Sequence, residues 1–136
     1  MPWPRSRILA VAVPALVLVA GLLGYAETRY EKSEVIEKAE TITGGSAERG
    51  KKAFSSYGCG GCHTLKGVPQ AAGLVGPPLD GIGARAIIGG RLDNTPDNLK
   101  RWIRDPQAVS PGTAMPRLGV TERDAKDISA LLYTSA

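Results

Sequence analysis

Hydrophobic and polar positions divide the chain into a long apolar run, a charged stretch and a mixed remainder. Residues 8–26 contain no charged side chain, and these 19 residues would span about 28 Å as a helix, close to the hydrocarbon thickness of a bilayer. Arg5 and Arg7 precede the run, and Trp3 and Tyr25 flank it where interfacial aromatic residues tend to lie. The pattern predicts a membrane anchor over residues 1–26, with the arginines inside and residue 27 onward exported.

A cleaved signal peptide is the alternative for the same run. Gly24 and Ala26 are small residues of the kind that precede a cleavage site. The apolar core of a secretory signal usually has about 7–15 residues, which is fewer than this run contains. Pro14 fits both interpretations, because it would kink a spanning helix without forbidding it. The length of the run favours an anchor that is retained.

Residues 27–45 are rich in glutamate and lysine. Glu34 lies four residues before Lys38, a spacing that supports an exposed helix. Gly44 and Gly45 are expected to end that helix. We therefore predict a solvated helical stalk over residues 27–45 and a globular domain from residue 46, with Ser46 as the N-cap of its first helix.

Three helices are predicted in residues 46–136. The first covers residues 47–57. The second begins with Thr95 as N-cap and Pro96 at its first position, and it ends before Pro106. The third begins with Thr121 as cap, and the apolar positions expected to be buried on or beside it are Val120, Ile128, Leu131 and Leu132. No convincing strand is present, so the domain is predicted to be all-α.

The stretch between the first two helices is unusual for a compact domain. Residues 67–96 contain seven glycines and four prolines and show little periodicity. A structureless segment of this length normally argues against one compact domain. The whole of residues 46–136 also contains only four aromatic residues, so its own core is small. Both features are explained if the loop wraps a large, flat, apolar cofactor.

Both cysteines of the chain and its only histidine lie within five positions, at Cys59, Cys62 and His63. A thioredoxin-like redox pair would follow a strand, but a helix is predicted just before this motif. A structural zinc site needs four ligands, and no further cysteine or histidine exists. Covalent haem attachment uses all three residues: each thiol adds to one vinyl group, and the adjacent imidazole binds the iron.

The order of three motifs resembles the class I cytochromes c. They are C-x-x-C-H at 59–63, "GPPLDG" at 76–81 and "DPQAVSPGTAMP" at 105–116. Residues 94–120 are similar to the cytochrome c domains associated with haem-copper terminal oxidases. The resemblance implies a class I cytochrome c fold wrapped around one haem c and preceded by a single N-terminal transmembrane helix. It divides the chain into an anchor (1–26), a stalk (27–45) and a haem domain (46–136).

The resemblance also assigns roles to single residues. His63 corresponds to the proximal iron ligand, and Pro77 to the residue whose carbonyl accepts a hydrogen bond from the other imidazole nitrogen. Arg85 corresponds to an arginine near a haem propionate, although it also fits an ordinary surface arginine. Trp102 corresponds to an aromatic residue that packs close to the haem and its methionine. A tryptophan that simply belongs to the core would look nearly the same in the sequence.

Met115 is the candidate for the sixth iron ligand. It is the only methionine besides the initiator, and it lies in a stiff segment between Pro111-Gly112 and Pro116. Because His63 is the only histidine, the iron has either Met115 or an open or weakly filled position opposite it. Gly50 and Phe54 match family positions where the first helix crosses the last. The sequence departs from the family there, since Leu131 replaces the usual tyrosine.

A haem with histidine and methionine ligands implies electron transfer rather than catalysis. We expect a protein of the bacterial cytoplasmic membrane with its haem domain on the periplasmic side. It would carry electrons from a quinol-oxidising complex to a terminal oxidase, or serve as a subunit of that oxidase, with no nucleic-acid partner and no small-molecule substrate. The alternative is a small haem c peroxidase or a gas-binding haem sensor with an open sixth site, which the absence of a second histidine disfavours.

The charge of the domain adds an expectation about docking. Residues 46–136 contain twelve Lys and Arg against eight Asp and Glu. By resemblance, Lys51, Lys52, Lys66 and Arg117 lie near the rim of the exposed haem edge. A basic rim there would steer the domain toward an acidic patch on its redox partner.

Overall fold

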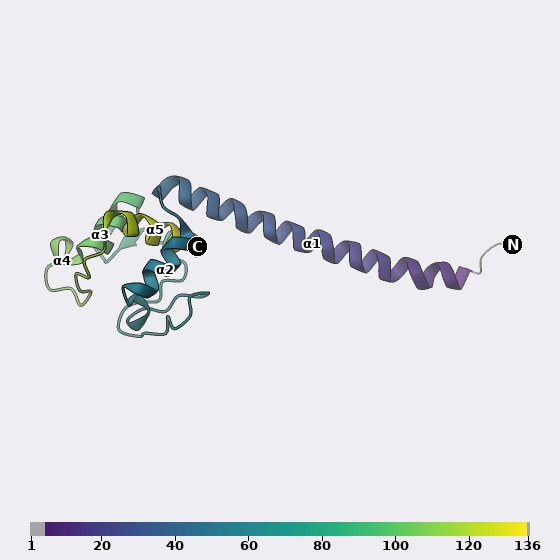
Figure 1. Cartoon of the computed structure of the whole chain (residues 1–136), viewed down its shortest axis with the longest axis horizontal. Helices are drawn as coiled ribbons and strands as arrows, with labels where there is room; N and C mark the ends of the chain where they lie inside the picture. Colours follow the sequence, from purple (N-terminus) through teal and green to yellow (C-terminus); the bar gives the residue numbers. More distant parts are fainter. Residues whose placement is uncertain (1–4, 136) are drawn as a thin grey trace. The chain divides into compact units, whose positions relative to one another are not determined.

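The computed structural model describes residues 5–135 of the chain, with side chains from residue 12 onward. Its helices are α1 (Arg5–Thr43), α2 (Ala47–Ser56), α3 (Pro96–Arg104), α4 (Pro106–Val109) and α5 (Glu122–Tyr133) (Figure 1). Two short 3₁₀ turns cover Cys59–Gly61 and Ile82–Ala84. The mostly helical fold that the sequence predicts is confirmed.

One small sheet departs from the expected absence of strands. Strand β1 (Ile87–Ile88) pairs antiparallel with β2 (Leu92–Asp93), with Ile88 opposite Leu92. The sharp turn between them contains Gly89 and Gly90, both with positive φ, a conformation that glycine adopts without steric cost. Helix α4 was not predicted either, because its four residues are too few to show a period.

Helix α1 contains the whole apolar run of residues 8–26 and continues to Thr43. Among the described residues, its segment Ala12–Thr43 is long and apolar enough to cross a membrane, judged by length and composition alone. Pro14 lies inside the helix without ending it. Trp3, the aromatic residue expected on one flank of the run, lies outside the described residues.

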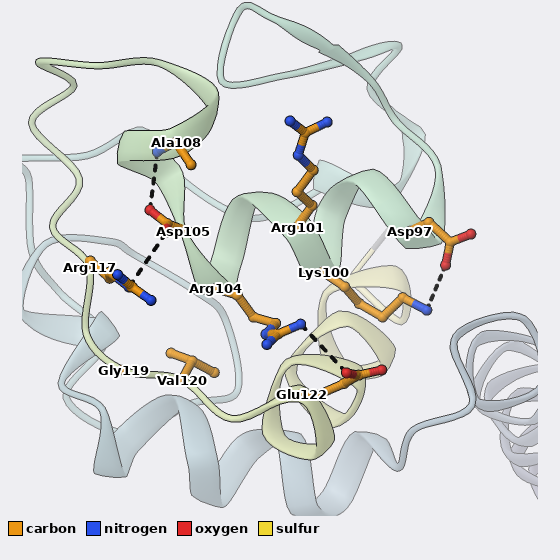
Figure 2. A pocket seen from close by; sticks show the side chains of 10 residues that line it. All are labelled: Asp97, Lys100, Arg101, Arg104, Asp105, Ala108, Arg117, Gly119, Val120 and Glu122. Atoms are coloured by element: carbon orange, nitrogen blue, oxygen red, sulfur yellow. Dashed lines mark hydrogen bonds and ion pairs between the residues drawn. The ribbon is translucent and has the colours of Figure 1, made fainter.

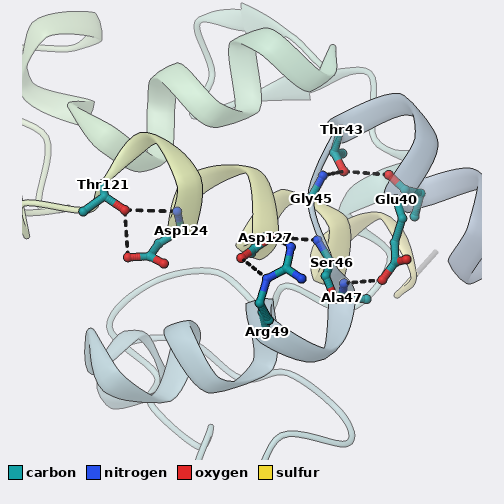
Figure 3. Close-up of polar contacts among 10 residues, drawn as sticks. Glu40, Thr43, Gly45, Ser46, Ala47, Arg49, Thr121, Asp124 and Asp127 are labelled. Atoms are coloured by element: carbon teal, nitrogen blue, oxygen red, sulfur yellow. Dashed lines mark hydrogen bonds and ion pairs between the residues drawn. The ribbon is translucent and has the colours of Figure 1, made fainter.

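The described structure divides into two units, Met1–Glu34 and Val35–Ala136. The second unit thus includes the last turns of α1, from Val35 onward. The reason is that the last turns of α1 pack onto the domain: Ala39 and Thr43 are both buried, and a carboxylate oxygen of Glu40 accepts a hydrogen bond of 2.8 Å from the backbone N–H of Ala47 (Figure 3). These turns are therefore partly covered by the domain, and the division into anchor (1–26), stalk (27–45) and haem domain (46–136) stays a prediction.

Helices α2 and α5 cross in close contact and form the centre of the second unit. Phe54 on α2 is fully buried, and Gly50 lies against the backbone of α5 at Asp127. This is the crossing that the resemblance implied for Gly50 and Phe54. Leu131, at the place usually held by a tyrosine, is half-buried and packs against the core.

A buried carboxylate fastens the two helices at one end. Asp127 on α5 is 2% exposed, and its two oxygens accept hydrogen bonds of 2.8 Å each from Arg49 on α2 (Figure 3). One of them also accepts a bond of 2.7 Å from the backbone N–H of Ser46. Ser46 precedes α2 as predicted, but its side chain makes no cap bond; its N–H is fixed by Asp127 instead.

The starts of α3 and α5 agree with the capping residues that the sequence predicts. The hydroxyl of Thr95 accepts a bond of 3.2 Å from the N–H of Asn98, and that of Thr121 accepts one of 3.1 Å from the N–H of Asp124. Of the apolar positions expected to be covered on or beside α5, three are buried: Val120, Ile128 and Leu132.

Candidate functional site

The cysteine motif lies in a tight turn directly after α2. Gly58 adopts a left-handed conformation with φ 70°, which reverses the chain and starts the 3₁₀ turn of Cys59–Gly61. The carbonyl of Cys59 then accepts bonds from the N–H groups of Cys62 and His63, at 3.2 and 3.0 Å. Both thiols are free and half-buried. The turn thus holds the two thiols and the imidazole as one rigid group.

The thiol of Cys59 is affected by its burial. Burial raises the pKa of the Cys59 thiol above its ordinary value. A metal binds the thiolate rather than the thiol, so a bound metal would have to lower this pKa again. In the described part of the chain, moreover, no three histidine, cysteine, aspartate or glutamate side chains gather where they could hold a metal ion.

The imidazole of His63 is oriented by a backbone carbonyl. Its Nδ1 lies 2.8 Å from the carbonyl oxygen of Pro77. Because a carbonyl oxygen only accepts hydrogen bonds, Nδ1 carries the proton and Nε2 keeps its lone pair. A carbonyl that receives the other ring N–H of a metal-binding histidine fixes the tautomer and raises the ligand's basicity. The lone pair of Nε2 on His63 is therefore available to bind a metal ion.

Gly76 allows the loop to approach the imidazole this closely. Its N–H donates a bond of 2.8 Å to the carbonyl of Cys62, and a Cβ at this position would collide with the ring of His63. The segment that carries Pro77 is thus placed against the histidine by a backbone bond to the cysteine motif itself. This explains why the loop needs glycine before its proline.

Arg85 braces the same segment. Its guanidinium donates bonds of 2.6 and 3.2 Å to the carbonyls of Pro78 and Asp80. The arginine therefore stiffens the chain beside Pro77, whereas its expected place at a haem propionate stays a prediction. Asn94 supports the arginine in turn, because its amide donates to the carbonyls of Ile82 and Arg85, at 2.7 and 2.8 Å. The sequence analysis did not single out Asn94, whose role depends on backbone carbonyls distant in sequence.

Met115 and Trp102 are the remaining residues that the sequence assigns to the site. The side chain of Met115 is half-buried. Its backbone carbonyl accepts a bond of 2.8 Å from the side-chain amide of Gln107, a residue that sequence analysis also missed. Trp102 on α3 is half-buried, and its ring lies so close to Gly89 that a Cβ there would collide with it. Trp102 thereby packs the turn between β1 and β2 against α3.

A charged groove lies beside α3 on the surface of the same unit (Figure 2). It encloses about 540 Å³ and is lined by Asp97, Lys100, Arg101, Arg104, Asp105, Ala108, Arg117, Gly119, Val120 and Glu122. Lys100 pairs with Asp97 at 2.7 Å, Arg104 with Glu122 at 3.5 Å, and Arg117 with Asp105 at 3.5 Å. Since four cations face three carboxylates, the groove is nearly neutral. Arg117, expected in a basic rim, thus has a carboxylate beside it.

The donor set fits a covalently attached haem. Two half-buried thiols are held one turn apart beside an imidazole whose Nε2 is available. Cys59, Cys62 and His63 are the residues that would attach such a group and ligate its iron, as the sequence predicts. Met115 supplies a thioether, a ligand that pairs with histidine in the cytochromes c.

Comparison with known proteins agrees with this arrangement. The family model described as cytochrome c matches residues 47–136. A protein named cytochrome c oxidase subunit 2, from Alkalihalophilus pseudofirmus, is 37% identical over 100 residues, which cover 74% of this chain and 27% of that protein. One of the same name from Bacillus sp. strain PS3 is 35% identical over 80 residues, covering 57% of this chain and 22% of that protein.

A smaller relative matches over most of its own length. Cytochrome c-550 of Nitrobacter winogradskyi is 33% identical over 95 residues, which cover 61% of this chain and 84% of that protein. The chain spans only about a quarter of the oxidase subunits that it matches. No solved structure matches significantly. Because the family model covers more than half of the sequence, the chain belongs to the cytochrome c family.

Proposed function

We propose that this protein is a membrane-anchored cytochrome c that receives and passes on single electrons at the outer face of the cytoplasmic membrane. The observation that carries the proposal is the bond of 2.8 Å between Nδ1 of His63 and the carbonyl of Pro77. It leaves Nε2 free as a donor beside the two thiols, and membership of the cytochrome c family supports the same role for these residues.

Four side chains would hold the cofactor. Cys59 and Cys62 would each form one thioether bond, and His63 and Met115 would be the axial ligands. Haem c, when bound, supplies an iron that gains and loses one electron. With protein ligands on both sides, no substrate needs to bind. Methionine keeps the reduction potential higher than a second nitrogen donor would, which suits transfer to an oxidase.

The partners follow from the relatives. Two of those described above are named cytochrome c oxidase subunit 2, and another is named cytochrome c-550. We infer that the acceptor is a haem-copper terminal oxidase, to which this protein is either bound as a subunit or tethered as a carrier. The donor would be a quinol-oxidising complex. The apolar part of α1 would hold the haem domain near both, on the side opposite Arg5 and Arg7.

Two measurements test the proposal. The intact mass after extraction with acid and organic solvent should still include one haem, since thioether bonds survive this treatment. Loss of the haem would contradict attachment through Cys59 and Cys62.

The oxidised protein should show the weak near-infrared band of methionine-ligated ferric haem, and Met115→Ala should abolish it. Rapid binding of carbon monoxide by the wild-type ferrous protein at neutral pH would instead favour a peroxidase or gas sensor with an open sixth site.

A further inference from the structure

Gln107 makes three hydrogen bonds to the backbone of the loop that carries Met115. Its side-chain N–H₂ donates bonds of 2.8 Å each to the carbonyls of Thr113 and Met115. Its side-chain oxygen accepts a bond of 3.1 Å from the N–H of Gly112. Both donor hydrogens and the acceptor of one amide are thus used on a single loop, and one of these bonds reaches the candidate ligand itself.

The loop has little else to fix it. Within the described part of the chain, residues 114–120 make no hydrogen bond between backbone groups, and the nearest such bond joins the N–H of Thr113 to the carbonyl of Ser110. A chain without a ladder of backbone bonds keeps more of its conformational freedom. The bond from Gln107 is therefore the main polar restraint on the backbone of Met115.

Gln107 can hold the loop of Met115 in place because α4, the helix that carries Gln107, is itself fixed by burial and by an N-cap. Pro106, at the first position of α4, is buried. A carboxylate oxygen of Asp105 accepts a bond of 3.1 Å from the N–H of Ala108 and caps the helix. In the neighbouring pair, Arg117 is exposed, Asp105 is half-buried and the charged atoms are 3.5 Å apart, so the pair contributes little. The restraint on the loop thus comes from the amide of Gln107 rather than from the charges nearby.

We propose that Gln107 is the positioning residue for Met115, holding the methionine backbone so that its thioether meets the iron at one fixed place. The inference rests on the proposed role of Met115 as the sixth ligand. Removing the two donors of Gln107 should leave the fold intact while loosening the bond from methionine to iron. Groups that orient a metal ligand without touching the metal typically change metal affinity by about 10–100-fold when they are lost.

The test uses Gln107→Glu in the full-length haem protein. Glutamate keeps the size of the side chain but places an oxygen opposite the carbonyls of Thr113 and Met115. The near-infrared band should weaken, and ferrous protein should bind carbon monoxide at least about tenfold faster than wild type. The matched control is Asn98→Asp, which removes one amide donor from the carbonyl of Asp93 on a different segment. It should leave both properties unchanged.

A second control tests whether lowered stability alone could weaken the band. Gly50→Ala perturbs the contact between α2 and α5 and leaves the loop of Met115 unchanged. That variant should unfold more easily in urea yet keep the band and the slow reaction with carbon monoxide. If Gln107→Glu fails to fold, Gln107→Leu takes its place, because it removes the same donors without adding a charge.

The outcomes distinguish this inference from the proposed function. If Met115→Ala abolishes the near-infrared band while the Gln107 variants keep it and bind carbon monoxide at the wild-type rate, the positioning role is overturned and the ligand assignment stands. If wild-type protein lacks the band and reacts with carbon monoxide as fast as Met115→Ala, the ligand assignment fails and the inference fails with it. A weakened band in Gln107→Glu together with wild-type behaviour of Asn98→Asp supports the inference.

Discussion

Gly50 on α2 lies directly against the backbone carbonyl of Asp127 on α5, so close that a Cβ would collide with it. The contact joins two helices that are far apart in the sequence, and the cysteine turn follows immediately after the first of them. Close backbone approach at this point therefore allows α2 and α5 to pack directly against each other.

Gly50→Ala should destabilise the protein. In an ordinary exposed helix the same change is stabilising by about 0.5–1 kcal/mol, because alanine loses less conformational entropy than glycine. Here the added methyl must push α2 and α5 apart, and overpacking of this kind costs about 1–3 kcal/mol. Urea unfolding of the haem protein measures the difference. An increase in stability would show that the helices separate freely and that the close contact is not required.

Asp127 should make stability depend on pH in the acid range. Burial by itself raises the pKa of its carboxyl group, but the hydrogen bonds from Arg49 and Ser46, together with the charges of Arg49 and Arg123, outweigh burial and leave the pKa below its ordinary value. The folded state thus binds this proton less readily than the unfolded state, whose pKa is about 3.9. The contribution to stability is fully present above that value and is lost as the pH falls through the lower folded pKa.

Asp127→Asn tests this expectation. At neutral pH the variant should be less stable by about 1–3 kcal/mol, since charged hydrogen bonds to Arg49 and Ser46 are weakened. The difference from wild type should shrink as the pH drops below about 4. Asp93→Asn is the control, because Asp93 is exposed on β2 and makes no ion pair among the described residues. A gap between wild type and Asp127→Asn that does not change with pH would contradict the assignment.

Much of this arrangement could be predicted from sequence because it depends on local chemistry. The capping role of Thr95 and Thr121 can be predicted from the helix-starting residues that follow each of them. The cysteine motif is likewise contained in five positions. Other features depend on partners far away in the chain. Ala39 and Thr43 lie in the charged stretch that predicts an exposed helix, and only the folded structure shows that both are buried. Gln107 was missed because its partners are backbone carbonyls, which leave no trace in side-chain patterns.

Gly76→Ala should interfere with the histidine ligand. The new methyl group would collide with the ring of His63 and separate Nδ1 from the carbonyl of Pro77. The fraction of purified protein that carries haem should fall, and the remaining holoprotein should have an altered reduction potential, because the imidazole loses the partner that raises its basicity. Gly61→Ala is the matched control in the same motif, since a methyl there would lie within 4 Å of no protein atom among the described residues. Equal haem content and potential in the two variants would argue against the role of Gly76.

Docking to the redox partner should depend on exposed lysines on α2 and just after the cysteine motif. Lys51, Lys52 and Lys66 are all exposed, and only Lys52 makes an ion pair among the described residues, an exposed one with Glu48 at 3.1 Å. Exposed pairs of this kind are weak and leave the charge available for long-range attraction. The fourth expected member of the rim, Arg117, has Asp105 beside it and contributes less net charge. The triple change of Lys51, Lys52 and Lys66 to Glu should therefore slow electron transfer to the oxidase at low salt.

The salt dependence then distinguishes a mobile carrier from a fixed subunit. The Debye length falls from about 10 Å at 0.1 M to about 3 Å at 1 M, so an encounter that is steered by charge slows strongly over this range. A subunit held beside its acceptor is already at high effective concentration and needs little steering. We expect a shallow dependence if the protein functions as part of an oxidase, measured as electron-transfer rate to the copurified enzyme. A steep dependence in wild type, abolished by the triple change, would indicate a tethered carrier that docks anew for each electron. No effect of the triple change at low salt would overturn the basic rim itself.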